Sequence, residues 1–254
     1  MEQYLVATEQ VVQQIEESNY ISRDLSWLKF NYRVLDQAMH ADRSIFDRLK
    51  FLSITASNLD EFFTIRLGSL YNYIDYGKER FDYSGLREEP FRKLLLSETQ
   101  KFYRDQNEYY VKALRPLFFK NGFSIVAFNE LSIENTQRVN EYFLKTIYPM
   151  LTPMVFDSYH TFPVLMNNRL LFGVVTKNPN ENQNQQKVSF IQVPQNLPRF
   201  YELALDGIIQ FVPIEEIIRN NVYNLFRNVE IISTNLFRIN RNGDFTLEES
   251  EDIE

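Results

Sequence analysis

The chain has 254 residues, of which 44% are hydrophobic and 24% are charged, and its formal net charge is −7. This length exceeds the roughly 100–150 residues typical of one domain, so we expect two domains, each with its own core. Because the sequence contains no cysteine, it excludes disulfides, thiolate nucleophiles, iron–sulfur clusters and cysteine zinc sites, in agreement with a reducing compartment.

Hydropathy and charge limit the class of protein further. No apolar run approaches the roughly 18 residues needed to cross a bilayer, and residues 1–20 lack the pattern of a signal peptide. We therefore expect a cytoplasmic protein without a transmembrane segment. Six acidic residues lie in the segment 244–254, and without them the net charge is −1, so the overall charge says little about which ligands bind. No nucleic-acid partner is expected.

The first half of the sequence predicts helices. From Asp24, apolar residues recur at alternating spacings of three and four, which predicts a helix over 24–40. A longer stripe of the same kind runs over 45–74, and a third helical stretch covers 88–120 before Asn121 and Gly122 end it. Residues 1–121 are therefore expected to form an all-helical domain.

Residues 57–61 (SNLDE), inside the second stripe, also have the pattern of a helix start. Asn58 could cap free backbone N–H groups, with Glu61 three residues later, so we expect a break or kink here. An amide, two carboxylates and Arg66 around a helix N-terminus would also favour binding of an acceptor or an anion. Both a simple cap and a ligand site are open interpretations.

The first predicted helix leaves a similar choice. Its polar and aromatic side chains could form a surface for a partner, although a tryptophan at helical spacing more often belongs to the core. The residues in question are Arg23, Asp24, Trp27, Lys29, Asn31 and Arg33.

After Gly122 the pattern changes to short β-rich runs separated by two helical stretches. The polar loop 178–186, which has no apolar residue, should join two strands into a hairpin. The sequence thus predicts an α+β fold, with the helical domain 1–121 followed by an α+β domain over 122–254. The strands are expected at 123–128, 170–176, 188–193, 208–212 and 229–239, and the helices at 132–148 and 214–226.

No complete active site can be assembled from residue patterns alone. Neither a dinucleotide-binding glycine motif nor a P-loop is present, and no serine lies in the GxSxG pattern. His40 and His160, the two histidines, lie far apart in different predicted domains, so each is more readily a structural or surface residue than a metal ligand. We therefore assign no catalytic residue and no metal ligand.

Several short motifs nevertheless carry a resemblance. Residues 20–31 (YISRDLSWLKFN), 48–52 (RLKFL) and 57–63 (SNLDEFF) occur in the order and spacing of the opening of bacterial polyphosphate kinases of the phosphohistidine type, which this half resembles. Further on, residues 151–163 and 193–215 are similar to the middle or head domain of that family. The resemblance covers the chain from about residue 20 to its end.

The resemblance implies that the parent enzyme moves the terminal phosphate of ATP reversibly onto inorganic polyphosphate, through a phosphorylated histidine and with Mg²⁺. In that family the histidine and the magnesium-linked arginines belong to two later domains. This chain is therefore expected to be an N-terminal portion, inactive alone, whose partners are the missing catalytic domains, ATP or ADP, and polyphosphate. Because His160 lies in a motif that resembles the head domain, the resemblance implies that it is not the phosphate acceptor. The family also implies a homo-oligomer with contacts through these domains.

One ligand residue carries over by position. The asparagine of the SNLDEF motif, which contacts the adenosine part of ATP in the family, falls on Asn58, and an amide offers both a donor and an acceptor to a planar base. The alternative comes from a different class: a non-catalytic oligomerisation or interaction module without a nucleotide site, in which Asn58 is only a cap. Composition does not separate the two.

Overall fold

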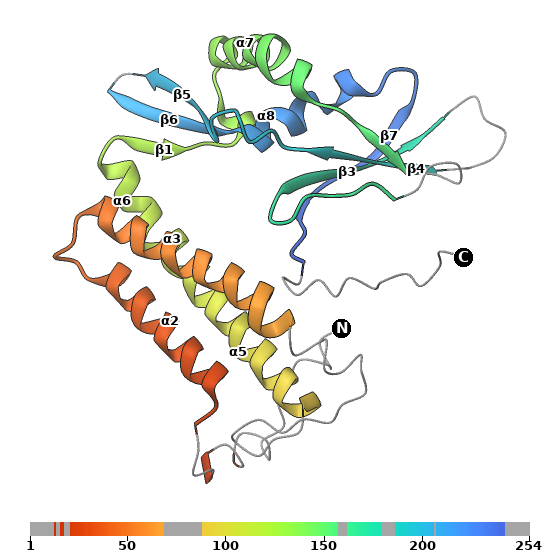
Figure 1. The fold of residues 1–254 in the computed structure, drawn as a ribbon. Coiled ribbons are helices and arrows are strands. Elements are labelled where there is room, and N and C mark those ends of the chain that lie inside the picture. The colour runs from red at the N-terminus through yellow and green to blue at the C-terminus, as the bar shows by residue number, and fades with distance from the viewer. Residues whose placement is uncertain are drawn as a thin grey trace, which may run out of the picture. The chain divides into compact units, whose positions relative to one another are not determined.

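A computed structural model describes residues 13, 16–17, 21–68, 88–156, 162–178, 186–205 and 207–241 (Figure 1). The chain divides into two compact units. The helical unit comprises Met1–Leu117 with Asn240–Glu254, and the mixed unit comprises Phe118–Ile239. Four features singled out in the sequence lie outside the described residues: the end of the second stripe (69–74), His160, most of the polar loop (179–185) and the acidic segment 244–254.

Three long helices form the described core of the helical unit: α2 (Arg23–Met39), α3 (Ile45–Glu61) and α5 (Glu88–Tyr109) (Figure 1). The predicted helix over 24–40 is confirmed by α2. Serine hydroxyls cap two of the helices: Ser22 accepts a hydrogen bond from the backbone N–H of Leu25, and Ser44 accepts one from that of Asp47.

The helix start expected at residues 57–61 is wrong. The α-helical pattern of α3 continues through them, and the change comes at a π-helical segment, η2 (Phe62–Leu67), where the backbone N–H of Phe62 contacts the carbonyls of Asn58 and Leu59. Asn58 therefore lies in the last turn of α3 and caps nothing. The reason is packing: Leu59 and Phe62 are almost fully buried, and this apolar stripe outweighs the local capping pattern.

A second π-helical segment, η3 (Tyr110–Leu114), follows α5 and leads into α6 (Arg115–Lys120). The boundary between the two units falls within α6, between Leu117 and Phe118. Within the helical unit, Trp27 stacks on Phe62 with ring centroids 4.6 Å apart.

The mixed unit contains two small sheets. In the first, β6 (Ile208–Pro213) lies between β1 (Phe123–Ile125), which is parallel to it, and β5 (Phe200–Leu205), which is antiparallel. The second is antiparallel, in the order β2 (Met154–Phe156), β4 (Gln186–Gln192), β3 (Leu170–Lys177) and β7 (Glu230–Arg238). Since β3 and β4 pair from Lys177 with Gln186 back to Leu171 with Gln192, the predicted hairpin is confirmed.

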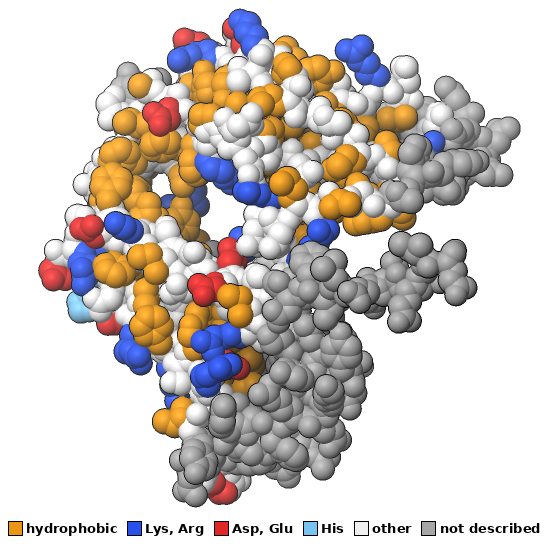
Figure 2. Space-filling model, in the orientation of Figure 1, with side chains coloured by type: hydrophobic (Ala, Val, Ile, Leu, Met, Phe, Trp, Pro, Cys, Tyr) orange, Lys and Arg blue, Asp and Glu red, His pale blue; other side chains and the backbone are white. Residues whose placement is uncertain are grey.

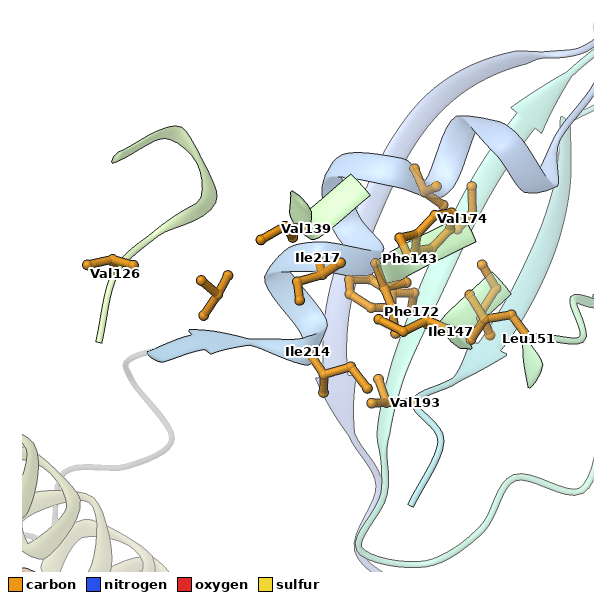
Figure 3. Close-up of a cluster of buried hydrophobic side chains, with 14 of the residues drawn as sticks. Val126, Val139, Phe143, Ile147, Leu151, Phe172, Val174, Val193, Ile214 and Ile217 are labelled. Atoms are coloured by element: carbon orange, nitrogen blue, oxygen red, sulfur yellow. The ribbon is translucent and has the colours of Figure 1, made fainter. Parts of the chain in front are cut away.

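Helical segments pack with these sheets around the main buried cluster of the unit, and a smaller cluster contains Leu165, Leu171 and Phe190. The predicted helix over 132–148 begins after its cap Ser132, as expected, and then changes pitch; the predicted helix over 214–226 ends in a 3₁₀ turn. Figure 3 shows Phe143 and Phe172 at the centre of the buried cluster, with Ile217 nearby. The segments are η4 (Phe128–Glu130), α7 (Ile133–Tyr142), η5 (Phe143–Ile147), η6 (Tyr148–Met150), α8 (Ile214–Asn221) and η7 (Val222–Leu225).

The predicted α+β fold class is confirmed by these elements. Within the described residues, no helix has both the length and the hydropathy needed to cross a membrane.

Candidate functional site

The Asn58 side chain lies at the end of a hydrogen-bonded chain that begins inside the helical unit. Its amide nitrogen Nδ2 donates to Oδ1 of Asn31 on α2, at 2.9 Å. Asn31 is fully buried, whereas Asn58 is only partly buried. The structure thus brings together two asparagines that lie in separate sequence motifs.

Further hydrogen bonds hold the Asn31 side chain inside the helical unit. Its Nδ2 donates to the backbone carbonyl of Thr55, at 3.2 Å. The Thr55 hydroxyl, which is also fully buried, donates to the carbonyl of Leu52 at 2.6 Å and accepts from Nε2 of Gln106 on α5 at 2.7 Å. This polar cluster therefore joins α2, α3 and α5, the three helices of the described core of the unit.

Sequence reasoning placed Asn31 on a possible partner surface, and the structure shows that this placement is wrong. Asn31 follows Leu28 by three positions and precedes Leu35 by four, and all three are buried. That spacing was the signal that could have revealed it, because residues three and four apart share one face of a helix. By contrast, Arg33 and Lys29 are exposed.

The charged residues of the SNLDEF region have different surroundings. Arg66, expected near Asn58, instead donates from Nη1 to Oδ1 of Asp24 at 2.8 Å, with both side chains largely buried. Its guanidinium also lies 5.9 Å from the ring centroid of Trp27. Arg66 therefore ties η2 to the start of α2, while Glu61 is exposed.

Arg48, in the RLKFL motif, also has structural contacts. Its Nη2 donates to the hydroxyl of Tyr109 at 2.8 Å, and its Nε donates to the carbonyl of Ala38 at 2.9 Å. The Tyr109 hydroxyl in turn donates to the same carbonyl. This motif therefore joins the ends of α2 and α5 to α3.

In the mixed unit, two segments of the family-like stretch 193–215, residues 197–200 (LPRF) and 211–215 (FVPIE), meet through an ion pair. Arg199 and Glu215 form a two-pronged contact in which Nη2 lies 2.6 Å from Oε1 and Nη1 contacts Oε2. Such a fork fixes the start of β5 against the first turn of α8. The geometry explains why these motifs contain an arginine and a glutamate without invoking a ligand.

The histidines and carboxylates show no metal-binding arrangement in the described part of the chain, where no three such side chains are placed to hold one ion. His40 is exposed beside Asp36 and Asp42, as expected for a surface residue. Among the described residues of the helical unit, Tyr32 is strongly perturbed: burial, together with a hydrogen bond that its hydroxyl donates to the Asp105 carboxylate at 2.9 Å, raises the pKa of Tyr32 well above its usual value.

Comparison with known proteins relates both domains of this chain to one family. The model of the polyphosphate kinase N-terminal domain matches residues 20–126, and that of the polyphosphate kinase middle domain matches residues 134–254. The polyphosphate kinase of Halalkalibacterium halodurans is 34% identical over 92% of this chain and 33% of its own length. That of Mycolicibacterium gilvum is 33% identical over 94% of this chain and 33% of its own.

A solved structure shows the same fold. The crystal structure of polyphosphate kinase from Porphyromonas gingivalis superposes with a TM-score of 0.77 at 24% identity, covering 91% of this chain and 34% of the other. The chain thus spans about a third of the length of the curated relatives that it matches. It belongs to the polyphosphate kinase family, of which it carries the N-terminal and middle domains.

Proposed function

We propose that these two domains form the nucleoside-binding side and part of the subunit contacts of a kinase that reversibly transfers the terminal phosphate of ATP to inorganic polyphosphate. The relatives named polyphosphate kinase support this reaction class. The catalytic histidine would lie in further domains of the enzyme, because this chain spans only about a third of the length of these relatives.

The observation that carries the nucleotide role is the state of Asn58. Its amide is held by one hydrogen bond to a buried partner, yet the side chain is only partly buried. A polar group fixed in this way is preorganised to bind a ligand at little entropic cost. The interpretation of Asn58 as a helix cap does not fit its place in the last turn of α3, but an interaction module without a nucleotide site remains the alternative.

Mg²⁺ enters the proposal only as a partner of ATP. The described residues offer no set of three carboxylate or histidine side chains that could hold it, so they do not fit a magnesium site. We assign Mg²⁺, like the phosphorylated histidine, to the remaining domains of the enzyme.

Exposed apolar side chains support a role in subunit contacts. Hydrophobic residues reach the surface of the mixed unit (Figure 2), and the exposed fractions of Ile133 and Val164 are 83% and 82%. Single exposed apolar side chains are common on protein surfaces, whereas a contiguous group of them is typical of sites that another protein surface covers. The interaction module without a nucleotide site would share this property, so it does not separate the two functions.

Substitution of Asn58 does separate them. In the full-length kinase that carries this sequence, Asn58→Ala should raise the KM for ATP about five- to thirtyfold, from a lost hydrogen bond of roughly 1–2 kcal/mol. The kcat should change less, because the contact is remote from the transferred phosphate. Ser53→Ala is the matched control, since Ser53 is an exposed residue of the same helix whose hydroxyl, among the described residues, bonds only to the carbonyl of Leu49. Unaltered ATP kinetics in Asn58→Ala would favour the interaction module.

The 254-residue chain by itself should neither make nor consume polyphosphate with ATP or ADP and Mg²⁺. Turnover above a blank without protein would contradict this division of roles between domains.

A further inference from the structure

We propose that Asn31 is a positioning residue that fixes the polarity of the Asn58 amide, so that Asn58 accepts a hydrogen bond from a donor group of the nucleoside. This inference rests on the proposed contact between Asn58 and the nucleotide. It adds a buried residue to the site and predicts which chemical group of the ligand is recognised.

The first step is the orientation of Asn31. An asparagine amide can be turned by 180° with little change in shape, so its hydrogen-bond partners decide which end is nitrogen. Behind Asn31 lies the backbone carbonyl of Thr55, at 3.2 Å. A carbonyl can only accept, so Nδ2 of Asn31 must face it, and Oδ1 of Asn31 must face Asn58.

The second step transfers this polarity to Asn58. Oδ1 of Asn31 can also only accept, so the atom 2.9 Å away must be Nδ2 of Asn58. A flipped Asn58 would place two carbonyl oxygens against each other. Within the described residues the Asn58 side chain makes no other hydrogen bond. Its oxygen is therefore left as an acceptor, together with one N–H.

The third step is the rigidity of the relay. Asn31 and Thr55 are fully buried, and Gln106 from α5 holds the hydroxyl of Thr55 at 2.7 Å. Rotation of Asn31 would leave a buried amide without partners, which is costly in a low-dielectric interior. The Thr55 carbonyl of α3 thus orients the amide of Asn31, which in turn orients the amide of Asn58. Asn58 is only partly buried.

The ligand group that fits the free Asn58 oxygen is a hydrogen-bond donor. On a nucleoside such as adenosine, this is the exocyclic amino group of the base or a hydroxyl of the ribose. A site built to bond a donor rejects an analogue that lacks it, because the site's own polar group is then left unpaired. If instead the buried pair of asparagines only specifies helix packing, its loss changes stability without changing nucleotide selectivity.

The test compares nucleotides in the full-length kinase that carries this sequence. Purine riboside triphosphate lacks the amino group, and 2′-deoxy-ATP and 3′-deoxy-ATP each lack one hydroxyl. The wild-type enzyme should use one of these analogues about five- to thirtyfold less efficiently than ATP in kcat/KM. In Asn31→Ala that ratio should fall toward one, with the KM for ATP raised more than kcat is lowered.

Asn221→Ala provides the matched control. Asn221 is a second buried asparagine, which donates to Oδ1 of Asn140 at 2.9 Å and to the carbonyl of Ile217 in the mixed unit. Its loss should lower stability but leave the ratio between ATP and the analogue unchanged.

The outcomes distinguish this inference from the proposed function. If Asn58→Ala leaves ATP kinetics unaltered, both are overturned. If Asn58→Ala weakens ATP use while Asn31→Ala keeps the wild-type selectivity, only the role of Asn31 is overturned. Should Asn31→Ala fail to fold, the wild-type comparison decides: a loss on removing one donor group supports the polarity, and equal use of all three analogues and ATP overturns it.

Discussion

The polar cluster between α2, α3 and α5 makes a measurable prediction about stability. Thr55→Val keeps the shape of the side chain but removes the hydroxyl that accepts from Gln106 at 2.7 Å. Nε2 of Gln106 then retains only a long contact of 3.4 Å to the carbonyl of Leu52. An unsatisfied donor in a buried site costs about 1–3 kcal/mol, and Gln106 is only half-buried, so we expect the low end, about 1 kcal/mol.

Thr99→Val is the matched control. The Thr99 hydroxyl is equally buried and donates to the carbonyl of Leu95 at 2.6 Å, as that of Thr55 donates to the carbonyl of Leu52. No side chain donates to Thr99 within the described part of the chain. The difference between the two variants therefore isolates the bond from Gln106.

Urea unfolding followed by tryptophan fluorescence measures this difference. Trp27 is the single tryptophan and packs on Phe62 in the helical unit, so its emission reports on that unit. A loss of about 1 kcal/mol corresponds to a midpoint about 0.3–1 M lower for Thr55→Val than for Thr99→Val. In a Gln106→Met background the difference should vanish. Equal midpoints for the two threonine variants would refute the reasoning.

Three other predictions address pH, core and turn. Because burial raises the pKa of Tyr32, the folded state keeps a proton that the unfolded state loses near the usual pKa of 10.0. The free energy of unfolding should therefore decrease as the pH rises above about 10. In Tyr32→Phe this decrease should be smaller, as measured by fluorescence-detected unfolding. Phe143→Ala empties a fully buried position and should cost about 3–5 kcal/mol by calorimetry, whereas Ile133→Ala, at an exposed position, should cost little. Gly122 and Gly207 have φ of +80° and +81°, so alanine at either position should lower the free energy of unfolding by about 1–2 kcal/mol. The decrease in melting temperature should be larger for Gly122→Ala, because the added Cβ would lie 3.3 Å from a backbone oxygen. Equal decreases in melting temperature would contradict this.

Local patterns predicted much of the secondary structure. The spacing of apolar residues located α2 and α3, and the helical stretch predicted over 132–148 located α7. The polar loop between two β-rich runs predicted the β3–β4 hairpin. These features depend on residues close together in the sequence, which is why one sequence suffices to find them.

The missed features depend on distant contacts. The parallel pairing of β1 with β6 joins Phe123 to Ile209, and no local pattern encodes such a partner. The strands β2 and β5 were also not predicted. In the site, Asn58 matched a capping pattern, yet burial of Leu59 and Phe62 kept α3 continuous around it. Its partner Asn31 lies on another helix, and although the spacing to Leu28 and Leu35 indicates that Asn31 is buried, no local pattern encodes its contact with Asn58.

The structure divides the family motifs of this chain into two kinds. Arg48 and Arg199, and also Arg66 three residues after the SNLDEFF motif, each make intramolecular contacts that hold one element to another. Their substitution should therefore change stability first and kinetics only in proportion to it. Asn58 differs because its one hydrogen bond orients an amide that stays partly exposed. Among these four residues, a change in ATP recognition without a matching loss of stability is expected at Asn58 alone, and the same change at one of the arginines would place that arginine in the nucleotide site.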